Sequence, residues 1–299
     1  MHRFLSPKNI IFPFYHTISD ENCPHIKNLY PLKTISQFEK ELDYFQKNYQ
    51  SISLEEIKIH IESGTQADKP SFFLSFDDGL AGCYSIIAPI LKKRNISAAF
   101  FINTGFIDNQ DLFYRYKVSL IIEKTAMSKG DLLNLTIHDL PKIDEIAKEA
   151  NLDFNQFLQQ EKPYMNWDEV KDLSAQGFYI GGHSVNHPYY NQISFDEQLF
   201  QTRSSIDTII SKLSLDYKIF SFPFTDLGVK KEFFETVYRE EIADLTFGTA
   251  GIKTDEFQRN LQRIPMDNCF GSPQRFIRKN LIQYHLKKLM NKDKVIHPL

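Results

Sequence analysis

Short apolar runs alternate along most of the chain with longer segments of helical spacing. The runs are rich in phenylalanine and β-branched residues and are bounded by turn residues, so each predicts a buried strand. Strands are expected at 9–15, 71–76, 98–103, 178–180, 219–222 and 243–247. Because these strands alternate with predicted helices, the pattern favours parallel pairing in an α/β layered or barrel fold.

The helices between the strands are predicted from capping signatures and apolar residues three and four positions apart. Three starts carry a capping pair: Ser36 with Glu39, Ser53 with Glu56, and Ser194 with Glu197. Further helices are expected through 88–91, from 167 to 177, around 233 and at 273–291.

One segment, from 106 to about 162, breaks this alternation. It is polar, it predicts helices at 116–124 and 141–150, and it contains no good strand. We therefore expect a single domain over 1–299, with a helical insertion at about 106–162 and a C-terminal helix at about 273–291.

Composition excludes several classes of protein. Hydrophobic residues make up 42% of the chain, including 26 phenylalanines, which is enough for a large core, and the formal net charge of −3 gives no reason to expect a nucleic-acid partner. No apolar run reaches the roughly 18 residues of a transmembrane helix. The first residues lack the apolar stretch of a secretory signal, so a cytoplasmic location is expected. Cys23, Cys83 and Cys269 are scattered, which indicates reduced thiols rather than disulfides or a zinc cluster.

Two adjacent carboxylates end the most apolar strand, in the stretch S-F-F-L-S-F-D-D-G at 71–79. Successive side chains of a strand point to opposite faces, so Asp77 and Asp78 are expected to do different jobs. Burial of a carboxylate is energetically unfavourable unless a cation pairs with it. The stretch therefore indicates a cationic partner, and Gly79 provides a sharp exit from the strand.

The sequence H-S-V-N-H-P at 183–188 offers ligands for such a cation. His183 and His187 follow a predicted strand and a glycine pair, and with one carboxylate they can form a metal site that keeps positions open for water and substrate. In α/β folds, active sites lie at the C-terminal ends of the strands, which meet on one face of the fold. The alternative is a helix-capping carboxylate pair and an unrelated histidine pair.

These two motifs resemble those of the polysaccharide deacetylases, the NodB-homology carbohydrate esterases. S-F-D-D-G is similar to the family's first motif, T-F-D-D-G, and H-S-V-N-H-P matches its second, H-[S/T]-x-x-H-P. The preceding sequence, M-N-W-D-E-V-K-D-L-S-A-Q-G-F-Y-I-G-G, also resembles the family's usual approach to the second motif. The resemblance covers residue 10 to about 267, without the insertion. It implies a deformed (β/α) barrel.

The resemblance also implies roles for the motif residues. Asp77 would be the catalytic base, and Asp78, His183 and His187 would hold a divalent metal. Zn²⁺ is the expected ion, with Co²⁺ and Ni²⁺ as alternatives. Such a metal lowers the pKa of its bound water to around 7 and polarises the acyl oxygen.

The third family motif, R-x-P-Y, has S-F-P-F at 221–224 as its counterpart. Pro223 fits, and the backbone N–H of Phe224 can face the oxyanion, but Ser221 replaces the arginine that normally pairs with the base. Near the end of the chain, R-I-P at 263–265 resembles an arginine motif of the circularly permuted branch. Arg263 is therefore the candidate partner of Asp77, with an ordinary surface or core-edge arginine as the alternative.

The family's late L-x-H motif, which supplies the general acid, is absent, and His285 is predicted to be a helix-surface histidine. The early sequence F-Y-H-T-I-S resembles the opening of the circularly permuted branch, which includes the poly-N-acetylglucosamine deacetylases. In that branch the acid comes from this strand, so His16 is the candidate. The alternative is a packing histidine at the end of a strand.

The expected activity is metal-dependent removal of an N-acetyl group from an amino sugar of a surface glycan or its precursor. The alternatives are a deformylase or cyclic-amide hydrolase on the same scaffold, or a catalytically degenerate glycan-binding protein. The basic C-terminal helix is expected to pack on the core, with peripheral contact to an anionic membrane as its alternative.

Overall fold

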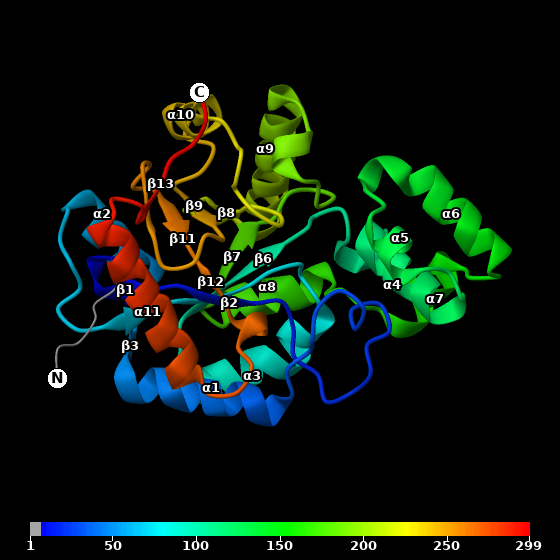
Figure 1. Cartoon of the computed structure of the whole chain (residues 1–299), viewed down its shortest axis with the longest axis horizontal. Helices are drawn as coiled ribbons and strands as arrows, with labels where there is room; N and C mark the ends of the chain where they lie inside the picture. The colour runs from blue at the N-terminus through cyan, green and yellow to red at the C-terminus, as the bar shows by residue number, and fades with distance from the viewer. Residues whose placement is uncertain (1–6) are drawn as a thin grey trace.

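The computed structural model describes residues 7–299, and its centre is a parallel sheet of eight short strands (Figure 1). The strand order is β11-β9-β8-β7-β6-β5-β2-β12, and every neighbouring pair is parallel. The strands are β2 (Pro13–Tyr15), β5 (Leu74–Phe76), β6 (Ala98–Ile102), β7 (Tyr179–Gly182), β8 (Ile219–Ser221), β9 (Leu245–Gly248), β11 (Asn260–Gln262) and β12 (Ile264–Pro265). The predicted deformed (β/α) barrel is confirmed.

The barrel is nearly closed by one stretch of chain. The two edge strands, β11 and β12, are separated only by Arg263, so the segment 260–265 pairs with β9 on one side and with β2 on the other. Backbone hydrogen bonds join Arg263 N to Gly248 O over 3.1 Å and Ile264 N to Phe12 O over 2.8 Å. This closure places the side chain of residue 263 at the seam of the barrel.

Two of the strands expected from the sequence are each divided in two. The run 9–15 forms β1 (Ile10–Ile11) and β2, and the run 71–76 forms β4 (Ser71–Phe72) and β5. The first halves pair with each other and with β3 (Gln50–Ser51) in a separate three-stranded sheet, whereas the second halves belong to the barrel. The prediction of single strands was wrong because the chain changes partner sheet at Phe12 and Phe73.

Helices surround the barrel (Figure 1). They are α1 (Ile35–Asn48), α2 (Leu54–Glu62), α3 (Ala88–Lys93), α8 (Trp167–Ala175), α9 (Phe195–Leu213), α10 (Lys231–Arg239) and α11 (Pro273–Leu289). The capping pair of Ser53 and Glu56 is confirmed, as is the cap of α9 at Ser194. The predicted start at Ser36 was wrong, because Thr34 and Gln37 form the capping box of α1 two residues earlier.

The segment 106–162 is helical, as predicted, and forms a lobe beside the barrel (Figure 1). It contains α4 (Tyr114–Lys124), α5 (Lys129–Leu133), α6 (Leu140–Glu149) and α7 (Phe154–Glu161), of which α5 and α7 were not expected. Its buried residues, including Tyr116 and Ile143, belong to the same apolar cluster as Phe76 and Phe100 of the barrel. The lobe therefore packs directly on the scaffold.

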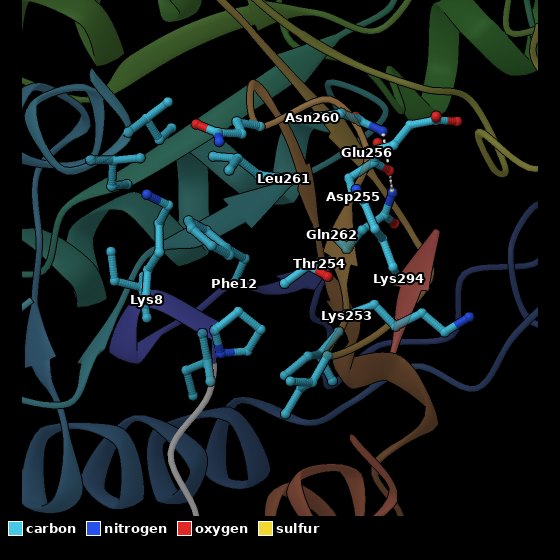
Figure 2. A pocket seen from close by; sticks show the side chains of 18 residues that line it. Lys8, Phe12, Lys253, Thr254, Asp255, Glu256, Asn260, Leu261, Gln262 and Lys294 are labelled. Atoms are coloured by element: carbon cyan, nitrogen blue, oxygen red, sulfur yellow. Dashed lines mark hydrogen bonds between the residues drawn. The ribbon is translucent and has the colours of Figure 1, made fainter. Parts of the chain in front are cut away.

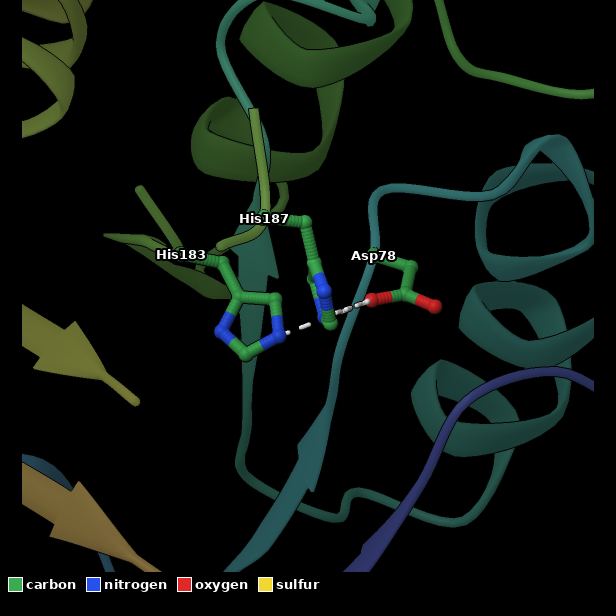
Figure 3. Close-up of side chains that lie close together, drawn as sticks. All are labelled: Asp78, His183 and His187. Carbon is green, nitrogen blue, oxygen red and sulfur yellow. Dashed lines mark ion pairs between the residues drawn. The ribbon is translucent and has the colours of Figure 1, made fainter. Parts of the chain in front are cut away.

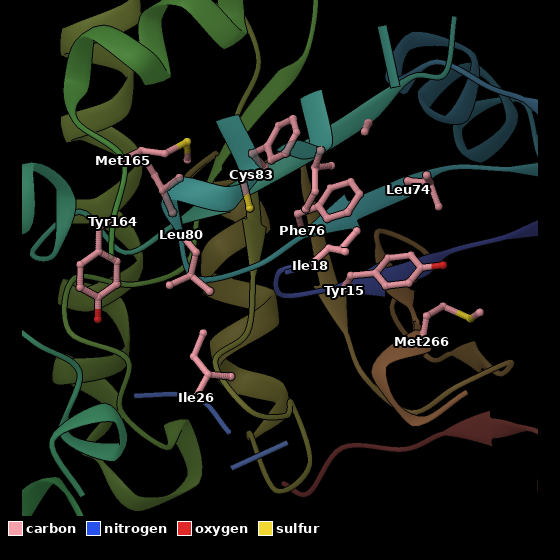
Figure 4. Packing of buried hydrophobic residues seen from close by; sticks show 14 of the residues in the cluster. Tyr15, Ile18, Ile26, Leu74, Phe76, Leu80, Cys83, Tyr164, Met165 and Met266 are labelled. Atoms are coloured by element: carbon pink, nitrogen blue, oxygen red, sulfur yellow. The ribbon is translucent and has the colours of Figure 1, made fainter. Parts of the chain in front are cut away.

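Stacked aromatic rings hold the neighbouring strands β2, β5 and β6 together. Phe76 stacks with Tyr15 and with Phe100, with ring centroids 5.7 and 5.2 Å away. Figure 4 shows Phe76 and Tyr15 within the surrounding apolar cluster. The three cysteines are free thiols, in agreement with the prediction.

Helix α11 buries Ile277, Leu281 and Tyr284 in the core, whereas Leu286 and Leu289 are 55% and 84% exposed. Peripheral membrane contact through this helix stays a prediction. Among the described helices, none is both long and apolar enough to span a bilayer.

Candidate active site

The carboxylates of Asp77 and Asp78 lie where β5 ends, and both are buried. The backbone N–H of Asp77 still bonds to the Tyr15 carbonyl of the neighbouring strand over 3.0 Å. Asp78 then adopts a left-handed conformation, with φ 76°, and Gly79 follows with φ 68°. A non-glycine residue in this region is strained, and such strain is common where a side chain is held for function.

The histidine motif follows β7 in the same way. The two glycines before His183 let β7 approach its neighbours, since a Cβ at Gly181 would lie 2.5 Å from the Phe101 ring. The Nδ1–H of His183 donates to the Ser221 carbonyl over 2.8 Å, so Nε2 is the ring nitrogen that faces the site. A tight turn closed by the hydrogen bond from His187 N to Ser184 Oγ brings the second imidazole alongside the first.

Asp78, His183 and His187 converge on one point (Figure 3). Asp78 Oδ1 lies 3.5 Å from His183 Nε2 and 3.3 Å from His187 Nε2. This buried oxygen has no hydrogen-bond partner within the described chain. Burial lowers the pKa of His187, which favours the neutral imidazole that a metal requires. An unsatisfied carboxylate oxygen beside two imidazole nitrogens fits a divalent metal with open positions.

The other oxygen of Asp78 is held by the insertion. Tyr116, on α4, donates its hydroxyl to Asp78 Oδ2 over 2.8 Å. This leaves Oδ1 as the atom that faces the two histidines. Sequence reasoning missed this contact, because no motif links Tyr116 to Asp78.

Asp77 is bound by Arg263, which the closing segment points into the barrel. Nη1 donates to Asp77 Oδ1 and Nη2 to Oδ2, each over 2.8 Å, and the arginine is fully buried. Burial alone would raise the pKa of Asp77, but the Arg263 guanidinium, followed by His183, outweighs it and lowers the pKa below its ordinary value. Nη2 also donates to Ser221 Oγ over 2.6 Å, at the position where the family motif has its arginine.

His16 follows β2 and lines the same pocket. Its Nδ1 lies 2.6 Å from Asp267 Oδ2, and its ring stacks on Tyr30 at 4.7 Å. Burial disfavours the imidazolium, but the Asp267 carboxylate outweighs this effect and raises the pKa of His16 to about 9. The side chain is 25% exposed, so a substrate can reach it. Sequence reasoning did not identify Asp267.

One pocket of about 270 Å³ joins these groups. Asp77, Asp78 and the three histidines line it together with Phe224, whose φ is 57° and whose ring contacts His187 at 4.5 Å. Pro223 lies between Phe222 and Phe224, both of which line the pocket. His285 lies on α11 and does not line the pocket.

A second cavity, of about 350 Å³, lies on the flank of the barrel between β1, α2, β10 (Thr254–Asp255) and β11 (Figure 2). None of the predicted site residues lines it. Asp255, at its edge, accepts hydrogen bonds from Asn260 and Gln262 and pairs with His297.

Asp226, Asp255 and His297 form a second buried group with metal-ligand side chains. Asp226 Oδ2 accepts from Asn260 and Gln262, and both ring nitrogens of His297 already face acceptors, the Val229 carbonyl and Asp255. This group is therefore a satisfied hydrogen-bond network that joins β11 to the segment after the last strand. Unlike Asp78 Oδ1, no buried side-chain oxygen or nitrogen of these three residues lacks a hydrogen-bond partner.

Comparison with known proteins agrees with the motifs and the fold. The polysaccharide deacetylase family model matches residues 64–232, more than half of the chain. His16, Arg263 and Asp267 lie outside that match. Among curated protein sequences, none matches the chain.

Several solved structures share the fold over most of both chains. The deacetylase PplD of Streptococcus pyogenes, in complex with acetate, is 18% identical, with a TM-score of 0.62 over 90% of this chain and 96% of that one. IcaB from Ammonifex degensii is 14% identical, with a TM-score of 0.61 over 92% and 97%. A de-N-acetylase from Aggregatibacter actinomycetemcomitans is 15% identical, with a TM-score of 0.59 over 89% and 98%. By its matched sequence the chain belongs to the polysaccharide deacetylase family.

Proposed function

We propose that the protein is a metal-dependent hydrolase that removes the N-acetyl group from an amino sugar of a glycan or a glycan precursor. The observation that carries the proposal is the convergence of Asp78, His183 and His187 beside an arginine-paired Asp77 in one pocket. This arrangement separates a metal-binding carboxylate from a second carboxylate that keeps its proton-accepting role.

Asp78 and the two histidines would hold the metal, through one carboxylate oxygen and two imidazole nitrogens. Zn²⁺ suits this donor set, and Co²⁺ and Ni²⁺ are the alternatives. When bound, the metal lowers the pKa of a coordinated water and polarises the acyl oxygen.

Asp77 acts as the general base. Arg263 keeps it ionised and fixes the plane of its carboxylate, because two parallel N–H···O bonds allow little rotation. The hydroxyl oxygens of Ser75 and Ser221 accept from the guanidinium and hold it in place, and the Ser221 hydroxyl also donates to Asp77 Oδ2 over 3.5 Å.

His16 is the general acid that protonates the leaving amine. Asp267 holds its Nδ1 and favours the protonated form, which leaves Nε2–H to donate to the substrate. The backbone N–H of Phe224 would donate to the oxyanion.

The alternative of a degenerate site rested on the missing third-motif arginine and the missing late histidine. The pairing of Arg263 with Asp77 and the position of His16 in the same pocket support an intact site. A deformylase or cyclic-amide hydrolase would use the same groups. A panel of formyl, acetyl and cyclic amides separates these activities.

The test measures the metal content of purified protein and acetate release from N-acetylglucosamine oligomers, before and after chelation and metal restoration. About one metal per chain with chelator-sensitive acetate release would support the proposal. Bound metal without acetate release would favour another acyl group, and a chain that binds no metal would contradict the proposal.

A further inference from the structure

Arg115 is a cation of the pocket that the proposed reaction does not use. It lies in the first turn of α4, in the insertion, and lines the same pocket as Asp77 and the metal-binding residues. Its Nε donates to the hydroxyl of Tyr114 and its Nη2 to that of Tyr189, each over 3.3 Å. These contacts use two of the five N–H groups of the guanidinium.

Aromatic rings fix the position of this guanidinium. Its central carbon lies 5.4 Å from the Phe224 ring and 6.0 Å from the Tyr189 ring, and these two rings stack at 3.6 Å. Phe224 also contacts His187. One ring therefore separates Arg115 from the metal-binding group, so a sugar held there could present a substituent to the arginine.

Each buried lysine or arginine among the described residues has a carboxylate partner, whereas Arg115 is half-buried. Lys117, on the same helix, pairs with Asp111 and Asp144, and Arg263 pairs with Asp77. Within residues 7–299, by contrast, no carboxylate lies within 4.0 Å of the Arg115 guanidinium. Holding a cation partly out of water without an anion is unfavourable, and aromatic contacts offset only part of that cost.

The start of α4 adds to the positive potential at this wall. Phe113 is its N-cap, lines the pocket and provides no capping hydrogen bond from its side chain. A helix N-terminus attracts anions, and here it coincides with the arginine.

We infer that Arg115 binds an anionic group, a carboxylate or a phosphate, carried by the substrate next to its N-acetylated sugar. The inference rests on the proposed function for the identity of the sugar. The planar fork of the guanidinium matches either anion with two parallel hydrogen bonds. The insertion would then set the preference for a charged glycan or a phosphate-bearing precursor.

The test measures the affinity of metal-loaded protein for three probes by calorimetry, in an Asp77→Asn background that slows turnover. The probes are N-acetylglucosamine, N-acetylmuramic acid, which carries a carboxylate, and N-acetylglucosamine 6-phosphate. We expect at least one anionic probe to bind at least tenfold more tightly than the neutral sugar, since hydrogen bonds between charged groups commonly give this factor. The two anionic probes distinguish the carboxylate source from the phosphate source.

Arg115→Gln should bring the ratio of anionic to neutral affinity close to one, and Arg115→Lys should keep part of the preference. Lys124→Gln, which removes the same charge from the exposed last turn of α4, should leave the ratio unchanged. If Arg115→Gln does not fold, added salt should weaken binding of the anionic probe to the protein with Arg115 intact and spare the neutral one. Equal affinity for charged and neutral probes, no binding of either anion, or a preference that survives Arg115→Gln would overturn the inference. Acetate release from neutral oligomers tests the deacetylase proposal separately.

Discussion

A single serine explains how the arginine that binds the proposed base, Asp77, can come from a different part of the chain. Ser221 stands where the family motif has arginine, and its short side chain leaves space that Arg263 fills. The guanidinium is fully buried among Asp77, two serine hydroxyls and the Phe14 ring at 4.2 Å. A buried arginine with this many partners can hold a carboxylate in one orientation, whereas an unpaired one would be strongly destabilising.

Asp77→Asn should distinguish the role of the proposed base from that of the proposed metal ligands. The amide keeps the size of the side chain but cannot accept the proton, so kcat should fall about 10²- to 10⁴-fold while the metal content stays the same. The measurement is metal analysis together with acetate release. Asp78→Asn is the matched control and should lose metal. A near-normal kcat for Asp77→Asn would contradict its role as base.

Asp267→Asn should change the pH dependence of activity. The pKa of His16 is about 9 because Asp267 outweighs the effect of burial, so without this carboxylate His16 loses its proton at a lower pH. The acid must be protonated, and the alkaline limb of kcat/KM should therefore move down by about 1 to 3 pH units. An alkaline limb that stays in place, or moves up, would show that another group supplies the proton.

At the scale of elements, helix α4 is the part of the insertion that contributes residues to the candidate active site. Its first turn and the residue before it place Phe113, Arg115 and Tyr116 at the pocket, and Tyr116 bonds directly to Asp78. The insertion therefore has a role in the site as well as in the core.

Tyr116→Phe should weaken metal binding. Loss of the hydroxyl frees Asp78 Oδ2 and allows the carboxylate to turn away from the two histidines, and groups that orient a metal ligand typically contribute about 10- to 100-fold in affinity. Competition with a chelator of known affinity measures the effect. Tyr190→Phe removes another buried hydroxyl, one that bonds to Thr202, and should not change metal affinity. Equal affinities in both variants would assign Tyr116 a packing role only.

The elements predicted from sequence are those with local signals. The strands that carry Asp77 and His183 and the helix caps at Ser53 and Ser194 depend on residues within a few positions of one another. The strands β11 and β12 have only three and two residues, which is too short for a periodic pattern. Asp267 meets His16 across 251 positions of sequence, and Tyr116 meets Asp78 across 38, so only the folded chain brings these pairs together.

At the scale of the whole molecule, the end of the described chain is attached to the strand that closes the barrel. Strand β13 (Lys294–Val295) pairs with β10, and His297 beyond it is buried against Asp255 and the Phe234 ring, 4.1 Å away. Asp255 in turn accepts from Asn260 and Gln262 of β11, while the next residue, Arg263, binds the proposed base. The network thus supports the segment from which Arg263 enters the site.

This attachment should make stability depend on pH through His297. The charged neighbours of His297 are Asp255, Asp226 and Glu256, and the Glu256 carboxylate accepts a hydrogen bond from the backbone N–H of His297. The imidazole ring also faces the Val229 carbonyl and the Phe257 ring. Burial opposes the imidazolium, but the hydrogen bond and charge of Asp255 outweigh it and raise the pKa of His297 above 6.5. A raised folded-state pKa stabilises the fold fully below about pH 6.5, and this contribution is lost as the pH rises through the folded-state pKa.

His297→Gln should therefore lower the free energy of unfolding by about 3 kcal/mol at pH 6, the range for breaking a buried charged pair, and by less at pH 9, because raising the pH progressively removes the charge of the native histidine. Urea denaturation of both proteins at the two pH values measures the difference. His138→Gln, at an exposed position in the insertion, is the control and should have little effect at either pH. A cost that is the same at both pH values would mean that His297 stabilises the molecule by packing alone, and a cost that grows with pH would contradict the charged pair with Asp255.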